Sequence, residues 1–317
     1  MTDFIVLTGF LGSGKTTLLA DFLALPDSAD TAVIVNEVGE IGLDGAILAE
    51  TGDVPIAMLS NGCICCALVG DLERTVRALL DARRHRPPLA RIILETSGLS
   101  KPGPILRSLA GLAPLGMRIG VTATFDCQAS AAGEGFEEAA AQWAGAQTLV
   151  LTKRDLASPA QRRRARGAAS GVNPMAELID TDDRAAAVRE AFSVRAGSRA
   201  PSAFDATEGL PHPRISVLLA RPDETVVWDD FAEWLDNLAG YCGERLLRVK
   251  GVMRVADHAQ PILVQSVGTL FSAPRPFGVV GDGRSFLVLI VRDLDAAELA
   301  RIVPPLGFRF TRLGLES

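Results

Sequence analysis

Eight residues near the start of the chain form a complete phosphate-binding motif. The segment Gly9-Phe10-Leu11-Gly12-Ser13-Gly14-Lys15-Thr16 matches G-x-x-x-x-G-K-[ST]. Glycines in such a loop let consecutive backbone N–H groups point inward at phosphate oxygens. Lys15 is expected to neutralise the β- and γ-phosphates, the Thr16 hydroxyl to coordinate Mg²⁺, and Thr17 to reach the α-phosphate. With Lys15 and Thr16, the nucleotide-contacting residues expected here are Gly12, Ser13, Gly14 and Thr17.

Lysine is rare in this chain, and three of its four lysines lie in recognisable motifs. Arginine supplies the other 28 of the 32 basic residues. Lysine is a compact point charge, whereas arginine is a broad planar fork, so we expect lysine where the fork does not fit. Besides Lys15, the motif lysines are Lys153 in Thr152-Lys153-Arg154-Asp155 and Lys250 in Arg248-Val249-Lys250-Gly251.

The tetrapeptide Thr152–Asp155 resembles the N/T-K-x-D motif with which GTPases read the base. A carboxylate such as Asp155 accepts hydrogen bonds from guanine N1–H and the 2-amino group, donors that adenine lacks. The stem of Lys153 can lie over the base plane. Thr152 stands where asparagine is commoner, which removes one side-chain amide contact. The motif favours GTP over ATP; an ordinary solvated turn is the alternative.

A second cluster of chemistry lies in Asn61-Gly62-Cys63-Ile64-Cys65-Cys66. Thiolates are soft ligands for Zn²⁺, Cu(I) and similar ions. Cys63, Cys65 and Cys66 leave the fourth tetrahedral position open, as a site that must release its ion requires. A helix expected just after Cys66 favours the thiolates by lowering the thiol pKa values. Buried core thiols and a redox role are the alternatives; the isolated Cys127 and Cys242 are expected in the core.

Strand-like apolar runs alternate with helical patterns through about residue 195, which predicts an α/β fold with a mostly parallel sheet covered on both faces. The expected strands are 4–8, 32–36, 56–59, 91–95, 120–126 and 148–152. The expected helices are 15–24, 72–83, 136–143, 159–168 and 183–192. The phosphate-binding motif follows the first strand and opens the first helix, which is the context it requires.

The rest of the chain predicts a small α+β domain. Residues 197–213 are small, polar and proline-containing, as in a linker. The expected domains are therefore 1–196 and 214–317, joined by the linker 197–213. In the second domain the patterns indicate strands and two helices, at 215–219, 229–238, 246–252, 262–267, 286–291 and 295–302.

Composition and charge exclude several classes of function. The 317 residues are 48% hydrophobic and 22% charged, as in a soluble globular protein. A net charge of −6 with no basic block beyond Arg162-Arg163-Arg164 argues against nucleic-acid binding. No apolar run reaches the roughly 18 residues that a membrane span needs. Asp3 and the lack of a positive region before the first apolar stretch argue against a signal peptide, and we expect a cytoplasmic protein.

Six motifs in order give the chain a family resemblance. They are GFLGSGKTTLL at 9–19, NEVGE at 36–40, GCICC at 62–66, ETSG at 95–98, TKRD at 152–155 and RVKG at 248–251. The chain resembles the CobW-type GTPases, relatives of metallochaperone GTPases and nitrile hydratase activators, over most of residues 2–317. The resemblance implies a P-loop domain followed by a CobW C-terminal domain. It also implies GTP hydrolysis coupled to transfer of a metal, Zn²⁺ or Co²⁺, to a client metalloprotein.

The resemblance also implies roles for individual residues. NEVGE would be the first switch, with Glu37 a ligand on the metal or Mg²⁺ side. Glu95 would be the acidic residue that orders Mg²⁺ or water, and Gly98 would offer its N–H to the γ-phosphate. Cys63, Cys65 and Cys66 would be the transition-metal ligands. Lys15, Glu95 and Gly98 are the expected catalytic residues.

The histidine content departs from that of many relatives, which carry a His-rich stretch in the linker or C-terminal domain. This chain has only His85, His212 and His258, each expected to face solvent. One metal ion per chain is therefore expected rather than storage of several. Two interpretations of Lys250 stay open: a role in the RVKG motif, or a surface charge at the end of a strand.

Because the cysteine loop lies between the two expected switches, metal affinity is expected to depend on the bound nucleotide. Two rival functions stay open. A P-loop kinase for a small molecule would need neither GCICC nor TKRD, and a nucleotide-gated scaffold or metal buffer would not turn over GTP. The sequence leaves open the metal, the client, any activating partner and the oligomeric state, a homo-oligomer included.

Overall fold

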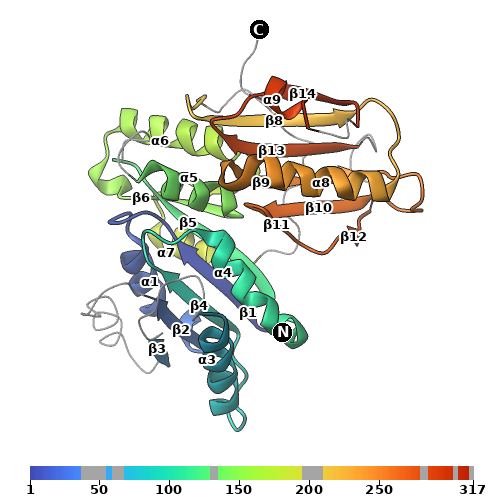
Figure 1. Cartoon of the computed structure of the whole chain (residues 1–317). Helices are drawn as coiled ribbons and strands as arrows, with labels where there is room; N and C mark the ends of the chain where they lie inside the picture. Colours follow the sequence, from blue (N-terminus) through green and yellow to red (C-terminus); the bar gives the residue numbers. More distant parts are fainter. Residues whose placement is uncertain are drawn as a thin grey trace. The chain divides into compact units, whose positions relative to one another are not determined.

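The computed structural model describes residues 1–36, 55–58, 68–128, 135–194, 210–278, 285–302 and 306–313. The chain divides into two compact units (Figure 1). One comprises Met1–Arg166 with Ala176–Ser198, and the other comprises Gly167–Met175 with Arg199–Ser317.

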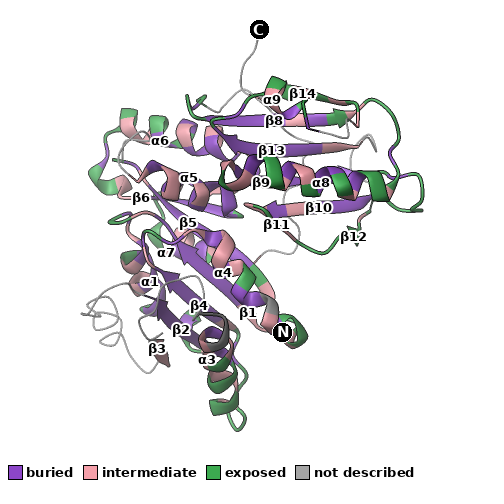
Figure 2. Ribbon diagram, in the orientation of Figure 1, coloured by how far each residue is buried: buried purple, intermediate pink, exposed green. Residues whose placement is uncertain are grey.

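The first unit is built on a parallel sheet. Among the described residues its strand order is β3-β2-β4-β1-β5-β6-β7, and every neighbouring pair is parallel. The strands are β1 (Asp3–Thr8), β2 (Thr31–Asn36), β3 (Ile56–Met58), β4 (Arg91–Thr96), β5 (Arg118–Asp126), β6 (Thr148–Thr152) and β7 (Glu177–Ile179). The central strands are buried almost throughout, because their continuous apolar runs are covered on both faces (Figure 2). The predicted α/β class is confirmed.

Helices α1 (Lys15–Leu23) and α7 (Arg184–Ala191) share one hydrophobic core with the sheet. In that core Phe22 lies 4.7 Å from Phe192, ring centre to ring centre, and both side chains are fully buried. Other helical segments are α3 (Leu68–Ala82), α4 (Pro102–Ser108), α5 (Phe136–Gly145) and α6 (Pro159–Val172), with the short turns η1 (Pro26–Ser28), η2 (Leu109–Leu115) and η3 (Arg154–Leu156). Trp143 of α5 packs on Phe125 of β5 and donates from Nε1 to the Thr124 carbonyl, which fixes α5 against the sheet.

The second unit carries an antiparallel sheet in the order β11-β10-β9-β13-β8-β14, with β12 paired to β10, in the part of the chain described. Its elements are β8 (Ile215–Pro222), α8 (Trp228–Cys242), η5 (Gly243–Arg245), β9 (Leu246–Met253), β10 (Ile262–Val267), β11 (Leu270–Phe271), β12 (Arg275–Pro276), β13 (Phe286–Arg292), α9 (Ala296–Leu299) and β14 (Phe308–Arg312). This agrees with the α+β prediction.

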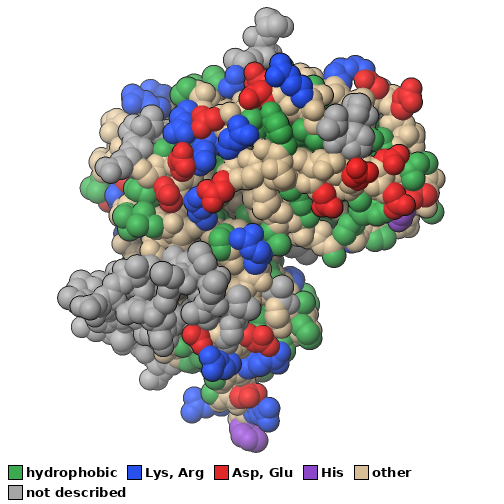
Figure 3. Space-filling view, viewed as in Figure 1, with side chains coloured by type: hydrophobic (Ala, Val, Ile, Leu, Met, Phe, Trp, Pro, Cys, Tyr) green, Lys and Arg blue, Asp and Glu red, His purple; other side chains and the backbone are tan. Residues whose placement is uncertain are grey.

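Helix α8 is amphipathic, and it covers one face of this antiparallel sheet. Phe231, Trp234 and Leu238 are buried in the core that the helix shares with the sheet. The opposite side of α8 is exposed and acidic, and red side chains gather over it in Figure 3. These exposed acidic residues are Asp229, Asp230, Glu233 and Asp236.

Lys250 on β9 departs from one of the two expectations. It is only 3% exposed, so it is not a surface charge at a strand end. Because side chains alternate along a strand, Val249 enters the α8 core and Lys250 lies on the other face with Arg248, which is equally buried. Burial, together with the charge of Arg248, lowers the pKa of Lys250 from 10.5 to about 8.

Candidate nucleotide site

The phosphate-binding motif occupies the carboxyl end of β1, the central strand between β4 and β5. This is the edge at which parallel sheets bind ligands. The loop follows Thr8 and ends at Gly14, which caps α1 in a left-handed conformation with φ 89°. Gly14 suits this position because it has no Cβ to resist a positive φ. The amino end of α1 therefore opens toward the loop, as phosphate binding requires.

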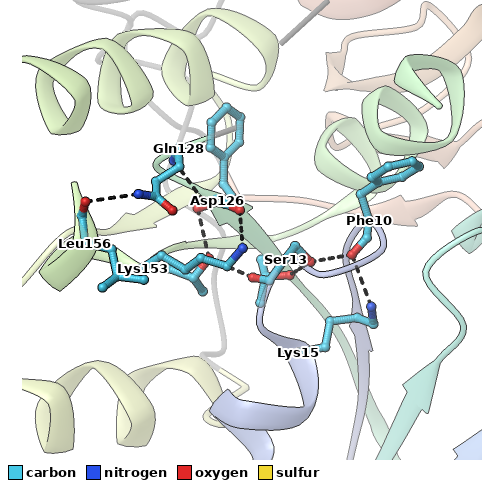
Figure 4. Close-up of polar contacts among 10 residues, drawn as sticks. Phe10, Ser13, Lys15, Asp126, Gln128, Lys153 and Leu156 are labelled. Atoms are coloured by element: carbon cyan, nitrogen blue, oxygen red, sulfur yellow. Dashed lines mark hydrogen bonds and ion pairs between the residues drawn. The ribbon is translucent and has the colours of Figure 1, made fainter. Parts of the chain in front are cut away.

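The side chains of the loop converge on one carbonyl oxygen. The Phe10 carbonyl accepts from Ser13 N at 3.1 Å, Ser13 Oγ at 2.7 Å and Lys15 Nζ at 3.2 Å (Figure 4). Ser13 Oγ also lies 2.6 Å from Thr124 Oγ1 on β5. Lys15 is almost fully buried, so its ammonium is held within the loop rather than extended into solvent.

Thr16 and Glu95 come together although they lie far apart in the sequence. Thr16 Oγ1 donates to Glu95 Oε1 at 2.6 Å, and Glu95, near the end of β4, is only 3% exposed. A hydroxyl and a carboxylate are hard oxygen donors of the kind that Mg²⁺ prefers. The donor set at this edge therefore fits the Mg²⁺ that the motif predicts.

Gly98 lies against the phosphate-binding loop. A Cβ at this position would be 2.7 Å from the backbone nitrogen of Leu11, so no larger residue fits without moving the loop. The turn that carries Gly98 is held by Gln142 of α5, whose Nε2 donates to the carbonyls of Gly98 at 2.9 Å and Ser100 at 3.0 Å. Gln142 is fully buried, and the sequence analysis did not single it out.

The base-reading motif is tied to the phosphate-binding loop through Thr152. Its Oγ1 donates to the Ser13 carbonyl at 2.7 Å and approaches the Phe125 carbonyl at 3.3 Å. The hydroxyl thus faces main-chain acceptors of the protein. Asp155 follows at the start of η3 with its side chain exposed, as a residue that contacts a base must be.

Charged partners hold the base-reading motif from two sides. Lys153, left-handed at φ 52°, places Nζ 2.6 Å from Asp126 Oδ2 at the end of β5 (Figure 4). Arg154 forms ion pairs with Asp180 and Asp182. The hydrogen bond from Arg154 is the main cause that lowers the pKa of Asp182. Asp126 was not predicted as a site residue, because a single carboxylate at the end of a strand forms no recognisable motif.

The predicted transition-metal ligands Glu37, Cys63, Cys65 and Cys66 lie outside the described residues. Within the described part of the chain, no group of three or more His, Cys, Asp or Glu side chains is placed to hold a metal. The predicted core cysteines are confirmed: Cys127 and Cys242 are buried, and burial raises the pKa of Cys242 to about 11.

The histidine predictions hold at two positions and fail at the third. His85 and His258 are exposed, as expected. His212 is only 8% exposed, and its Nδ1 accepts a hydrogen bond from the backbone N–H of Arg214 at 3.1 Å. The expectation of a solvent-facing His212 was wrong, because a nearby backbone donor satisfies the ring once it is buried.

Family models match both parts of the chain. Residues 3–180 match the CobW/HypB/UreG nucleotide-binding domain, and residues 215–303 match the cobalamin synthesis protein cobW C-terminal domain. In the described residues, no helix is both long enough and apolar enough to cross a membrane.

Named relatives resemble the chain over most of its length. It is 30% identical to the zinc chaperone YjiA of Escherichia coli, over 86% of this chain and 89% of that protein. It is 27% identical to the zinc chaperone CobW of a Sinorhizobium species, over 95% and 96%. The crystal structure of Zn(II)-bound YjiA GTPase from E. coli has the same fold, with a TM-score of 0.65 at 23% identity over 96% of this chain and 98% of that one.

Proposed function

The chain belongs to the CobW/HypB/UreG family and is a GTPase, and from this premise we propose that it hydrolyses GTP to transfer zinc to a client protein. The zinc would bind at Cys63, Cys65 and Cys66, with Glu37 as a further ligand. Cobalt is the alternative metal, since thiolates accept several ions. The proposed domain limits are those predicted from the sequence, 1–196 and 214–317 with a linker between them.

One observation carries the nucleotide half of the proposal. The Thr16 hydroxyl lies 2.6 Å from the Glu95 carboxylate, and Lys15 is held in the adjoining loop. Residues of two motifs that lie far apart in the sequence thus meet at one edge of the sheet. Cation, hydroxyl and carboxylate are the groups that phosphoryl transfer needs around the phosphates.

We expect the site to act by positioning and by neutralising charge. Lys15 and the backbone N–H groups of the loop would hold the phosphates and balance the charge that develops on them. Bound Mg²⁺ would supply further neutralisation between the phosphates, held by Thr16 and Glu95. Gly98, fixed through its carbonyl by Gln142, would present its N–H to the γ-phosphate. These roles are proposals for this chain.

Base selection would fall to Asp155 and Lys153. An exposed carboxylate can pair with the two guanine donors, and adenine would leave it unpaired. The ordered main-chain contacts of Thr152 support this proposal, because they fix the loop in which Asp155 is presented.

The metal half of the proposal rests on the C-x-C-C sequence and on relatives whose names call them zinc chaperones. The cysteine loop lies between Asn36, at the end of β2, and Glu95, near the end of β4. A nucleotide that orders the flanking segments would change the metal affinity. Zinc would then change the nucleotide affinity by the same factor.

The experiment measures phosphate release from GTP with and without zinc, together with zinc content, in the wild type and in Cys63→Ala/Cys65→Ala/Cys66→Ala. The wild type should release phosphate and bind one zinc ion per chain. The triple variant should lose the zinc and keep basal hydrolysis. Appearance of a phosphorylated small molecule would replace the proposal with a kinase. If no GTP is hydrolysed even in a single turnover, the remaining interpretation is a nucleotide-gated metal buffer.

A further inference from the structure

The short segment Asp126-Cys127-Gln128 begins at the last residue of β5, and each of its residues contacts the base-reading motif or the residue after it. Asp126 Oδ2 pairs with Lys153 Nζ at 2.6 Å. The backbone N–H of Cys127 donates to the Thr152 carbonyl at 3.1 Å. Gln128 Nε2 donates to the Leu156 carbonyl at 3.0 Å (Figure 4). The segment therefore contacts the chain from Thr152, the first residue of the motif, to Leu156, the residue after Asp155.

The carboxylate of Asp126 is held in place by the backbone of Gln128, two residues further along the chain. Its Oδ1 accepts the backbone N–H of Gln128 at 2.8 Å, which leaves Oδ2 directed at Lys153. The side chain of Asp126 is only 12% exposed and that of Lys153 is 33% exposed, so water screens the pair less than it would screen a fully exposed one. The carboxylate thus fixes the position of the lysine ammonium.

Lys153 needs such a restraint. It has φ 52°, a left-handed conformation that is uncommon for a residue with a side chain. A long lysine stem also has many rotamers, and ordering it costs free energy. If the stem is to cover one face of the base, the protein gains affinity by ordering it before the nucleotide arrives.

We propose that Asp126 is a positioning residue for guanine recognition, which it serves by holding Lys153 and with it the loop that presents Asp155. The inference rests on the proposed base-reading role of Asp155. The side chain of Asp126 contacts Lys153 and the backbone N–H of Gln128. Its loss should therefore weaken nucleotide binding and base selection and spare the chemical step.

The test compares GDP and ADP affinities, and turnover at saturating GTP, for the wild type, Asp126→Asn, Lys153→Met and the double variant. Asp126→Asn should bind GDP about two- to fivefold more weakly, the scale of a partly exposed ion pair. It should also lose part of its preference for GDP over ADP, and its turnover at saturating GTP should stay within about twofold of wild type. Since Asp126 acts through Lys153, the double variant should bind GDP no more weakly than Lys153→Met alone.

Asp3→Asn is the matched control. Asp3 pairs with Arg118, at the other end of the same strand β5, at 2.7 Å. Its loss should cost a similar amount of thermal stability and leave GDP binding unchanged. An Asp126→Asn protein with wild-type affinity and selectivity would overturn the inference. So would a double variant whose loss of GDP affinity equals the product of the losses in the two single variants. If the wild type binds ADP and GDP with equal affinity, the proposed recognition of guanine by Asp155 is wrong instead.

Discussion

The two ends of strand β5 carry almost the same ion pair in two different settings. At the amino end Arg118 pairs with Asp3 at 2.7 Å, with side chains 39% and 13% exposed. At the carboxyl end Lys153 pairs with Asp126 at 2.6 Å, with side chains 33% and 12% exposed. Distance and burial do not distinguish the two pairs. What differs is the segments that they join.

The amino-end pair joins two neighbouring strands that are already bonded along their length, with Asp3 in register with Arg118. The carboxyl-end pair joins Asp126, which is in register with Thr152 at the last position of the β5–β6 ladder, to Lys153, which lies just beyond that ladder. Thr152 in turn contacts the phosphate-binding motif at the Ser13 carbonyl. The same chemistry thus reinforces the sheet at one edge, and at the other it holds the lysine that we propose covers the base. The predictions below test this difference between the edges, from the largest expected effect to the smallest.

Lys15→Ala removes the positive charge at the centre of the carboxyl edge. Hydrolysis should fall by about two to three orders of magnitude, as for other losses of preorganised charge stabilisation. Thermal stability should change little, because the contact of the ammonium with the Phe10 carbonyl, at 3.2 Å, lies within its own loop. Phosphate release under saturating GTP checks the prediction, with Asp3→Asn as the control. Retained turnover in Lys15→Ala would remove the phosphate assignment.

Asp155→Asn changes the hydrogen-bond acceptors and donors that residue 155 presents to the base. The amide would no longer accept both guanine donors, whereas xanthine, with an oxygen in place of the 2-amino group, suits its N–H₂. We expect preference to shift from GDP to XDP by about a hundredfold, a scale set by leaving polar groups unpaired. Competition between labelled GDP and XDP measures the shift. An unchanged ratio would mean that another group reads the base.

Gln142→Leu tests the turn that carries Gly98. Loss of two buried hydrogen bonds to the Gly98 and Ser100 carbonyls should loosen that turn. Turnover should fall about tenfold while GDP affinity stays near wild type, because Gly98 is proposed to contact only the γ-phosphate. Separate measurements of kcat and GDP affinity decide this. A drop in GDP affinity with unchanged kcat would place the turn outside the γ-phosphate site.

Lys250→Met tests a lysine that, unlike Lys153, has no acidic partner among the described residues. Burial lowers its pKa from 10.5 to about 8, so between these values the unfolded chain binds more protons than the folded chain. Raising the pH through this window therefore favours the folded state. The stability of the wild type relative to Lys250→Met should rise by about 1 kcal/mol from about pH 7 to about pH 9.

Urea unfolding of both proteins at each pH measures this difference. Burial raises the pKa of the Cys242 thiol to about 11, so that thiol favours the folded state less as the pH rises. Both proteins contain Cys242, so its effect cancels in the comparison. A stability difference that does not change with pH would show that the folded-state pKa of Lys250 is close to its ordinary value.

Local signals in the sequence were enough to predict the phosphate-binding loop and most strands of both units. Glycine spacing and apolar runs are properties of short segments, so they appear without knowledge of the fold. The prediction missed β7, β11, β12 and β14. The first three are only two or three residues long, and β14 has only Phe308 and Phe310 as apolar residues, although both pack against the core. It also missed α4, whose Pro102 and Pro104 suggest a turn although proline is well suited to a first helical turn.

The supporting residues of the site could not be predicted in the same way. Asp126 and Gln142 are ordinary polar residues in sequence, and only the fold brings them to Lys153 and Gly98. The expectation of Lys250 as a surface charge was wrong for a related reason: it lies inside β9, and its burial depends on tertiary packing that the sequence does not reveal. Motifs thus predicted the groups proposed to contact ligand, whereas the groups that position them required the structure.

The central claim is that the triphosphate site at the carboxyl edge and the three-cysteine loop respond to each other. Zinc affinity measured with a non-hydrolysable GTP analogue and again with GDP tests it most directly. The account predicts different zinc affinities in the two states, with the triple cysteine variant binding no zinc in either. Equal zinc affinities with both nucleotides would contradict it.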